Sequence, residues 1–305
     1  MPPPGYQHYA PPPGYQHYPP PPGHQYYTPG YGVPTFRQLP TAFYASPDDP
    51  LVSADLSGWW TRSFRLVRAA WRPIALFELL AAIPLIIFLI QVEIQTNSVV
   101  TMLDSADIDW GGVLRNYALM APTFLIALVF SMIATLASLQ VLVQQATGRP
   151  LSIGEALRTA MYRLPALIGW GIPAGLMVLA GIAACFLPGI YLLLVIATFP
   201  TVVLLERGNP ISRVFALFHA DLGASLIRAL VTGAVIYGLQ IGSSIITNPI
   251  TAIAGQSTAT TIVTQVIAGL ITAAGTALAA AFQLTTYADL RARFEPFSTA
   301  YLLPR

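Results

Sequence analysis

The sequence predicts an all-α, polytopic membrane protein with six transmembrane helices, arranged as three hairpins that are each preceded by a cytoplasmic interfacial amphipathic helix. Three observations predict this class. Of 305 residues, 55% are hydrophobic and 9% are charged, whereas a soluble domain carries about 25% charged residues. Six apolar runs are long enough to cross about 30 Å of hydrocarbon. A short phrase also repeats, as GRPLSIGEAL at 148–157 and GNPISRVFAL at 208–217.

The N-terminal region is built from a nine-residue repeat. Residues 2–28 read PPPGYQHYA, PPPGYQHYP and PPPGHQYYT. Proline-rich sequence favours the extended polyproline II helix and cannot form a buried core, so we expect residues 1–50 to be a disordered cytoplasmic tail. Two roles fit this composition. The tail is either a solubilising leader or a docking strip whose tyrosines suit an aromatic-lined groove on a protein partner.

The next segment, residues 53–72, is predicted to be a helix lying on the membrane surface. At about 100° per residue, large apolar side chains cover one arc of this helix and arginines cover the opposite arc. Tryptophan beside arginine is typical of a helix in the interface of an anionic bilayer. The membrane-interface anchors expected from this pattern are Trp59, Trp60, Arg62, Arg65, Arg68, Trp71 and Arg72.

The six apolar runs follow, and we expect them to form a domain over residues 51–295 with a short cytoplasmic C-terminal tail at 296–305. The spans are predicted near 73–92, 118–143, 166–186, 188–205, 224–246 and 262–284. The third and fourth are nearly continuous. The sequence FLPGI at 186–190 is predicted to be the tight turn between them, with Pro188 and Gly189 as the breaker.

The repeated phrase is predicted to start two further amphipathic helices, each before a membrane hairpin. In the first copy Ser152 is a candidate N-cap, and Glu155 completes a capping box. In the second copy Asn209 is the expected cap, Pro210 occupies the first helical position, and Gly223 suits the C-terminal end. The chain thus divides into parallel units at about 53–145, 148–207 and 208–293. Duplicated hairpins can simply build a bundle, although internal repeats are also common in transporters.

Arginine placement predicts the orientation of the spans. All 15 basic residues are arginine, and 14 of them fall on the side of the membrane that holds both termini. Arg115 alone falls on the other side. By the positive-inside rule, both termini are therefore expected in the cytoplasm of a multi-pass plasma-membrane protein.

Two ionisable residues lie inside predicted spans. Glu78 and Arg228 are both about 8–9 Å from the cytoplasmic boundary at 1.5 Å per residue, so an ion pair between them is possible. The alternative is that each side chain extends to the lipid headgroups. Polar and small residues are further candidates for helix–helix contacts: Gln140, Gln240, Gln265, Gln283, and the pairs Gly171/Gly175 and Gly238/Gly242.

The C-terminal phrase TTYADLRARFEP, at 285–296, contains a distinctive polar pattern: Tyr287, Asp289, Leu290, Arg291, Arg293 and Glu295. Read from the residues alone, the two arginines are cytoplasmic anchors and the aspartate can bond an arginine of a neighbouring interfacial helix. This predicts a structural lock, with a ligand site as the alternative.

The same pattern resembles the closing motif of the membrane-domain family named after bacterial glycerophosphoryl diester phosphodiesterases. The run at 187–217 is similar to the middle of that family through Pro188-Gly189, Pro200 and Glu206-Arg207-Gly208. Stand-alone members look like the proline-rich integral membrane proteins of actinobacteria. In the named enzymes a separate barrel carries the metal-dependent chemistry, so the resemblance implies a membrane domain without that activity.

No residue pattern points to catalysis. The sequence has no H-E-x-x-H, Walker A, G-x-S-x-G or G-x-G-x-x-G motif. We therefore expect no enzyme activity, catalytic residue, metal site or cofactor, and no nucleic-acid partner. The expected function is a membrane scaffold or partner-docking protein that contacts anionic lipid at the cytoplasmic face. The alternative is a transporter or accessory protein for lipids or other lipophilic molecules.

Overall fold

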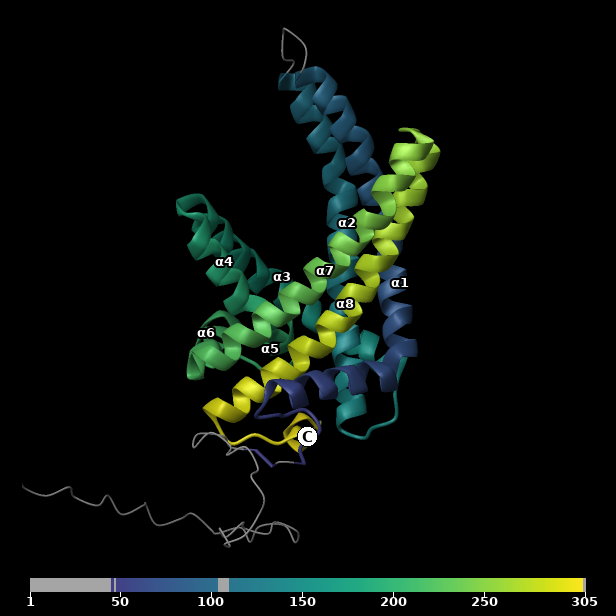
Figure 1. The fold of residues 1–305 in the computed structure, drawn as a ribbon. Coiled ribbons are helices and arrows are strands. Elements are labelled where there is room, and N and C mark those ends of the chain that lie inside the picture. Colours follow the sequence, from purple (N-terminus) through teal and green to yellow (C-terminus); the bar gives the residue numbers. More distant parts are fainter. Residues whose placement is uncertain (1–44, 47, 104–109, 304–305) are drawn as a thin grey trace, which may run out of the picture. The chain divides into compact units, whose positions relative to one another are not determined.

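The computed structural model describes residues 45–303 apart from 47 and 104–109, and the proline-rich repeat lies outside these residues. The described residues all belong to one compact unit. They form helices and no strand (Figure 1). The elements are α1 (Leu56–Leu103), α2 (Trp110–Ala146), α3 (Ile153–Ala184), α4 (Phe186–Val195), η1 (Ile196–Thr198), α5 (Phe199–Leu205), α6 (Pro210–Ala220), α7 (Leu222–Ala254), α8 (Thr258–Phe294) and η2 (Thr299–Leu302).

Six helical segments of the described chain are long and apolar enough to cross a membrane, which confirms the all-α polytopic class. Five of them are α1, α2, α3, α7 and α8, and the sixth, Phe186–Leu205, combines α4, η1 and α5. They run longer than the predicted spans because the amphipathic segments at their ends are helical as well.

The three predicted interfacial helices join their hairpins in different ways. In α1 the break is at Ala70, whose φ of −116° and ψ of 17° are not helical. In α3 the helix continues through Pro165 into the span without a break. In α6 the helix ends at Ala220, and the Asp221 carboxylate then accepts a bond from the Ala224 N–H at 3.0 Å to cap α7. Gly223 therefore lies inside α7, and its predicted role at the end of the preceding helix is wrong.

The predicted N-caps are confirmed, whereas the capping box is only half formed. Ser152 accepts a bond from the Glu155 N–H at 3.3 Å, and Asn209 accepts from the N–H groups of Ile211 and Ser212. The Glu155 carboxylate instead pairs with Arg149 at 2.8 Å. Thus the side chain that would complete the box is used to hold the preceding loop.

The turn between the third and fourth spans lies one residue before the predicted one. Cys185 is the extended residue between α3 and α4, and Pro188 and Gly189 lie in the first turn of α4. Proline is tolerated there because its missing N–H would have no helical partner. Gly189 instead permits a close approach, since a Cβ at this position would lie 2.8 Å from the Ile182 nitrogen.

The predicted glycine pairs do not mediate close packing. A Cβ added at Gly171, Gly175, Gly238 or Gly242 meets no atom within 4 Å among the described residues. The close contact instead occurs at Gly269, where a Cβ would clash with the side chain of Ile86. A G-x-x-x-G spacing shows that a backbone is accessible but not which helix face is buried.

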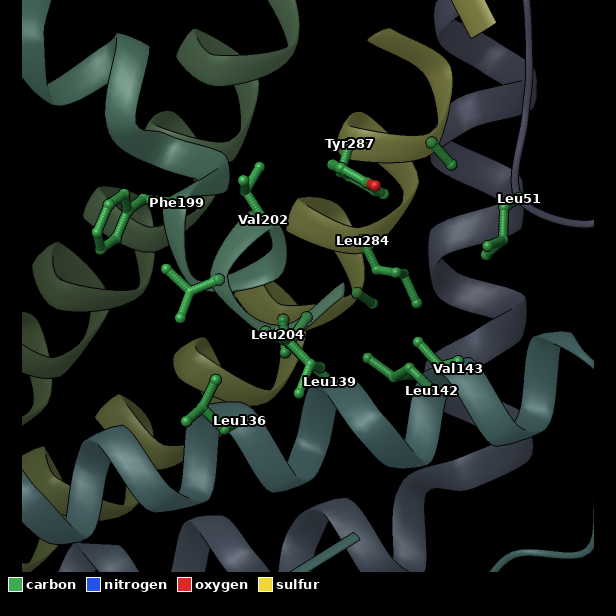
Figure 2. Packing of buried hydrophobic residues seen from close by; sticks show 14 of the residues in the cluster. Leu51, Leu136, Leu139, Leu142, Val143, Phe199, Val202, Leu204, Leu284 and Tyr287 are labelled. Carbon is green, nitrogen blue, oxygen red and sulfur yellow. The ribbon is translucent and has the colours of Figure 1, made fainter. Parts of the chain in front are cut away.

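The buried core lies at one end of the helices, where α1 packs against α2 and α8, and α8 also packs against α7. Its members come from several helices, and those from α2, α5 and α8 are labelled in Figure 2: Leu136, Leu139, Leu142, Val143, Phe199, Val202, Leu204, Leu284 and Tyr287. We call this part of the fold the basal end and define it by residues 48–72, 134–165, 199–228 and 279–302. It contains most of the described arginines.

The segments that flank the helices are packed into the basal end. Asp49 is buried, and its carboxylate accepts bonds from the N–H and hydroxyl of Thr299 at 2.8 and 2.5 Å. Leu51 and Phe297 belong to the same core. The folded region therefore begins before residue 51, and residues 297–302 are part of it rather than a free tail, which corrects both predicted boundaries.

Candidate functional site

The polar residues of the C-terminal motif lie on the last turns of α8 and bond other parts of the basal end. Asp289 is fully buried, and its Oδ2 pairs with Arg228 of α7 at 2.8 Å and with Arg293 at 3.2 Å. Leu290, the residue after Asp289, is buried in the core. Asp289 was expected to bond an arginine of a neighbouring interfacial helix, but its partners are Arg228 of the span α7 and Arg293 of its own helix.

Both arginines also bond the backbone of the segment directly before α1. Arg228 donates to the Ser53 carbonyl at 3.2 Å, and Arg293 donates to the Ala54 carbonyl at 2.9 Å. Arg293 also pairs with Asp221 at 2.5 Å. We call these residues the Asp289 network: Asp221, Arg228, Asp289 and Arg293. It joins α7, α8 and the segment before α1, so Arg293 is a structural group as well as a basic residue near the boundary.

A second set of bonds joins α8 to the loop before α6. The Tyr287 hydroxyl donates to Glu206 at 2.7 Å and accepts from Arg291 at 2.9 Å. Arg213 bridges Glu206 at 2.7 Å and Glu295 at 2.6 Å, and Arg291 also pairs with Glu295 at 2.5 Å. The motif residues thus act together as the structural lock that the sequence predicted.

These pairs favour the charged forms of the groups outside the spans. Burial disfavours the ionised form of each, but the opposing charges outweigh it. The Ala224 N–H and Arg293 lower the pKa of Asp221, and Arg291 with Arg213 lowers the pKa of Glu295. Hydrogen bonding to Glu206 and Glu295 raises the pKa of Arg213. Asp221, Glu295 and Arg213 are therefore charged near neutral pH.

The predicted pair between Glu78 and Arg228 is wrong. Glu78 is buried and accepts bonds from the Ser138 hydroxyl at 2.9 Å and the Thr276 hydroxyl at 2.6 Å. Arg228 is committed to Asp289. The two residues were matched on their predicted depth along the spans, but depth does not fix which way each helix faces. Neither side chain extends to the headgroups, since Glu78 is 4% and Arg228 is 2% exposed.

The predicted glutamine contacts have mixed outcomes. Gln240 of α7 donates to the Thr272 hydroxyl of α8 at 3.2 Å, which confirms one helix–helix bond. The Gln283 carbonyl oxygen is buried and has no hydrogen-bond partner in the described part of the chain. An unpredicted glutamine, Gln144, bonds the Ser152 backbone at both its N–H and its carbonyl and holds the loop between α2 and α3.

The expected membrane-interface anchors divide into two groups. Trp59 is fully buried, stacks on Phe282 at 5.0 Å and donates from Nε1 to Thr286 at 3.1 Å. Trp59 is therefore part of the protein core, which corrects its assignment as a lipid-facing anchor. Arg62 is half-buried. The remaining residues are exposed on the first part of α1 and the turn after it: Trp60, Arg65, Arg68, Trp71 and Arg72.

A cleft of about 530 Å³ lies at the basal end between α3, α5, α6 and the loop at 206–209. Its lining residues are Arg163, Ala166, Trp170, Val202, Val203, Glu206, Arg207, Gly208, Asn209, Pro210, Ser212, Arg213 and Ala216. The lining combines three arginines with apolar side chains. The arginines that flank the repeated phrase were a visible signal for this cleft. The sequence did not show that they come together in space.

Within the described ranges, no group of three or more His, Cys, Asp or Glu residues is arranged to hold a metal ion. Comparison of the chain with protein-family models, with curated proteins and with solved structures finds no match.

Proposed function

We propose that this protein is a non-enzymatic scaffold of the plasma membrane whose basal end faces the cytoplasm and binds anionic lipid. One observation carries the proposal. Arg65, Arg68 and Arg72 are exposed and have no acidic partner among the described residues. The exposed ring of Trp60 lies before the break at Ala70, with Arg65 and Arg68, and the exposed ring of Trp71 directly follows it, beside Arg72. Arginine and tryptophan together suit a surface of anionic headgroups over hydrocarbon.

The arginine count on each side supports the orientation in this proposal. Most of the described arginines belong to the basal end. Arg115 instead lies near the start of α2, at the end of that helix away from the basal end. By the positive-inside rule the basal end is cytoplasmic, and so are both termini. The proline- and tyrosine-rich tail then extends on that side, where we propose that it docks a protein partner.

The lipid part of the proposal is tested by extracting the protein from vesicles that contain equal amounts of phosphatidylglycerol and phosphatidylcholine. The ratio of the two lipids that co-purify is measured. Changing Arg65, Arg68 and Arg72 together to Gln should bring the ratio close to that of the vesicle, because each basic residue near an anionic surface contributes about 1 kcal/mol. The matched triple change to Lys should keep the enrichment. Equal ratios for the wild type and the Gln variant would contradict the proposal.

The docking part is tested by crosslinking in cells with the full chain and with a chain that lacks residues 1–50. A partner lost only from the shortened chain is expected. Identical partner sets would contradict the docking role and leave the tail as a solubilising leader.

A second function, an accessory protein or transporter for lipophilic molecules, is favoured by the half-apolar cleft at the basal end. Vesicles that contain the protein should then move labelled phospholipid between leaflets faster than empty vesicles do.

We also propose kinship with the membrane-domain family that the C-terminal motif resembles. The proposal is supported by the motif itself, in which every polar residue makes an intramolecular bond.

A further inference from the structure

The cleft at the basal end contains two arginines that the rest of the described chain does not neutralise. Arg163 of α3 and Arg207 of the loop between α5 and α6 both line it. Neither has a hydrogen bond or an ion pair with any described residue. Their charges also repel each other. A protein that holds two like charges beside a cleft gains stability when an anion binds between them.

The other charged groups that line the cleft balance each other. Glu206 accepts bonds from Arg213 and from the Tyr287 hydroxyl, so both of its carboxylate oxygens are already used. Arg213 is shared between Glu206 and Glu295. The net positive charge of the cleft therefore comes from Arg163 and Arg207.

Neutral donors converge on the same cleft. The N-terminal turn of α6 lines it through Pro210 and Ser212, and the first turn of a helix attracts anions. Asn209 already caps two N–H groups of this turn, so the helix contributes its dipole more than its free donors. The Ser212 hydroxyl lines the cleft and donates to no described residue. Gly208 adopts a φ of +129°, which lets the loop turn tightly above the site.

The rest of the lining is largely apolar. It comes from three helices: Ala166 and Trp170 of α3, Val202 and Val203 of α5, and Ala216 of α6. A free phosphate ion would leave these apolar side chains unused. A phospholipid would place its phosphate against the arginines and its glycerol and first acyl carbons against the apolar side chains, because guanidinium groups bind phosphate through paired hydrogen bonds.

We propose that the cleft between α3, α5 and α6 is a binding site for the phosphate headgroup of an anionic phospholipid, with Arg163 and Arg207 as its ligands. This rests on the proposed function, which places the basal end at the cytoplasmic headgroup layer. The cleft would bind one lipid per chain, in addition to the nonspecific lipid contacts of the arginine and tryptophan surface on α1. Trp170 is the aromatic edge of the site, and Ser212 is its neutral donor.

The experiment is a titration of the purified full chain in detergent, followed by native mass spectrometry and by the shift in thermal unfolding midpoint. The probes are phosphatidylglycerol, phosphatidylcholine and soluble glycerol 3-phosphate. We expect one tightly bound phosphatidylglycerol per chain. The variant Arg163→Gln/Arg207→Gln should weaken its apparent Kd about tenfold or more, because it loses charge-assisted bonds.

Two controls keep the test decisive. The charge-matched variant Arg115→Gln/Arg158→Gln changes two exposed arginines outside the cleft and should keep wild-type affinity. If Arg163→Gln/Arg207→Gln proves unstable, Ser212→Ala and Trp170→Ala serve instead and should each weaken binding.

The proposal is overturned if the cleft variants bind phosphatidylglycerol as tightly as the wild type, or if phosphatidylcholine binds equally well. Equal binding of glycerol 3-phosphate would overturn the lipid source and show a soluble phosphate ligand. The triple Gln change at Arg65, Arg68 and Arg72 leaves the cleft intact, so a failure of the surface proposal and a failure of the cleft proposal are told apart by separate variants.

Discussion

Replacing Asp289 by Asn should leave the buried Arg228 without its ion-pair partner. The Asp289 carboxylate is fully buried, and Arg228 beside it is 2% exposed. Breaking a buried ion pair by removing one partner costs about 3–5 kcal/mol, since the remaining charge has lost both water and its counterion. At about 2–4 °C per kcal/mol for a chain of this size, the midpoint of thermal unfolding should fall by roughly 6–20 °C.

The assay is thermal unfolding in one detergent, followed by tryptophan fluorescence. The matched control is Glu155→Gln, which breaks the half-exposed pair with Arg149 and should cost about 0–1 kcal/mol. The double variant Asp289→Leu/Arg228→Met removes the charged pair and should recover most of the loss, because apolar replacements of buried pairs are often neutral. Equal losses in Asp289→Asn and Glu155→Gln would refute the reasoning, as would a double variant less stable than the single one.

Three further outcomes are expected in the same unfolding assay. Trp59→Ala should cost about 3–5 kcal/mol because it empties a buried site, and a loss below 1 kcal/mol would contradict its place in the core. Gly189→Ala should cost about 1–3 kcal/mol through overpacking, whereas Gly171→Ala should be neutral; equal effects would refute the close approach. Since the pKa values of Asp221 and Glu295 are lowered on folding, stability should be constant near neutral pH and fall below about pH 4.5; a flat acid limb would contradict this.

The spans could be predicted from the sequence because hydrocarbon thickness sets a minimum apolar length, and each apolar run met it. The helix starts were also predictable, since Ser152 and Asn209 are strong N-cap residues directly before amphipathic runs. The turn between α3 and α4 was harder to predict from the sequence. A Pro-Gly pair usually marks a turn, but here the proline fits the first turn of α4 and the glycine fits against Ile182.

The partners of charged residues were harder to predict, because the sequence gives depth along each helix but not its rotation. Glu78 was matched with Arg228 on depth alone, while the true partner, Asp289, lies near the end of the adjacent helix α8. Trp59 was misplaced for a related reason. An apolar arc on an interfacial helix can face lipid or protein, and only the position of Phe282 across from it decides between them.

The cap at Asp221 had a signal that sequence reasoning did not use. An aspartate directly before an apolar run is a preferred N-cap, and it would have separated α6 from α7 at the correct residue. Its second role, as a partner of Arg293, depends on two segments that are 72 positions apart and has no local signature.

The bonds between the first and last described segments have a consequence for synthesis. Trp59 bonds Thr286 across 227 positions, and Asp49 bonds Thr299 across 250. A chain emerging from the ribosome therefore exposes its N-terminal segment long before the matching residues exist. These contacts can form only after the final helix has been made and inserted. Closure of the basal end thus reports that α8 and residue 299 have been made, and a chain stopped before α8 would carry an open end with unpaired donors for quality control to recognise.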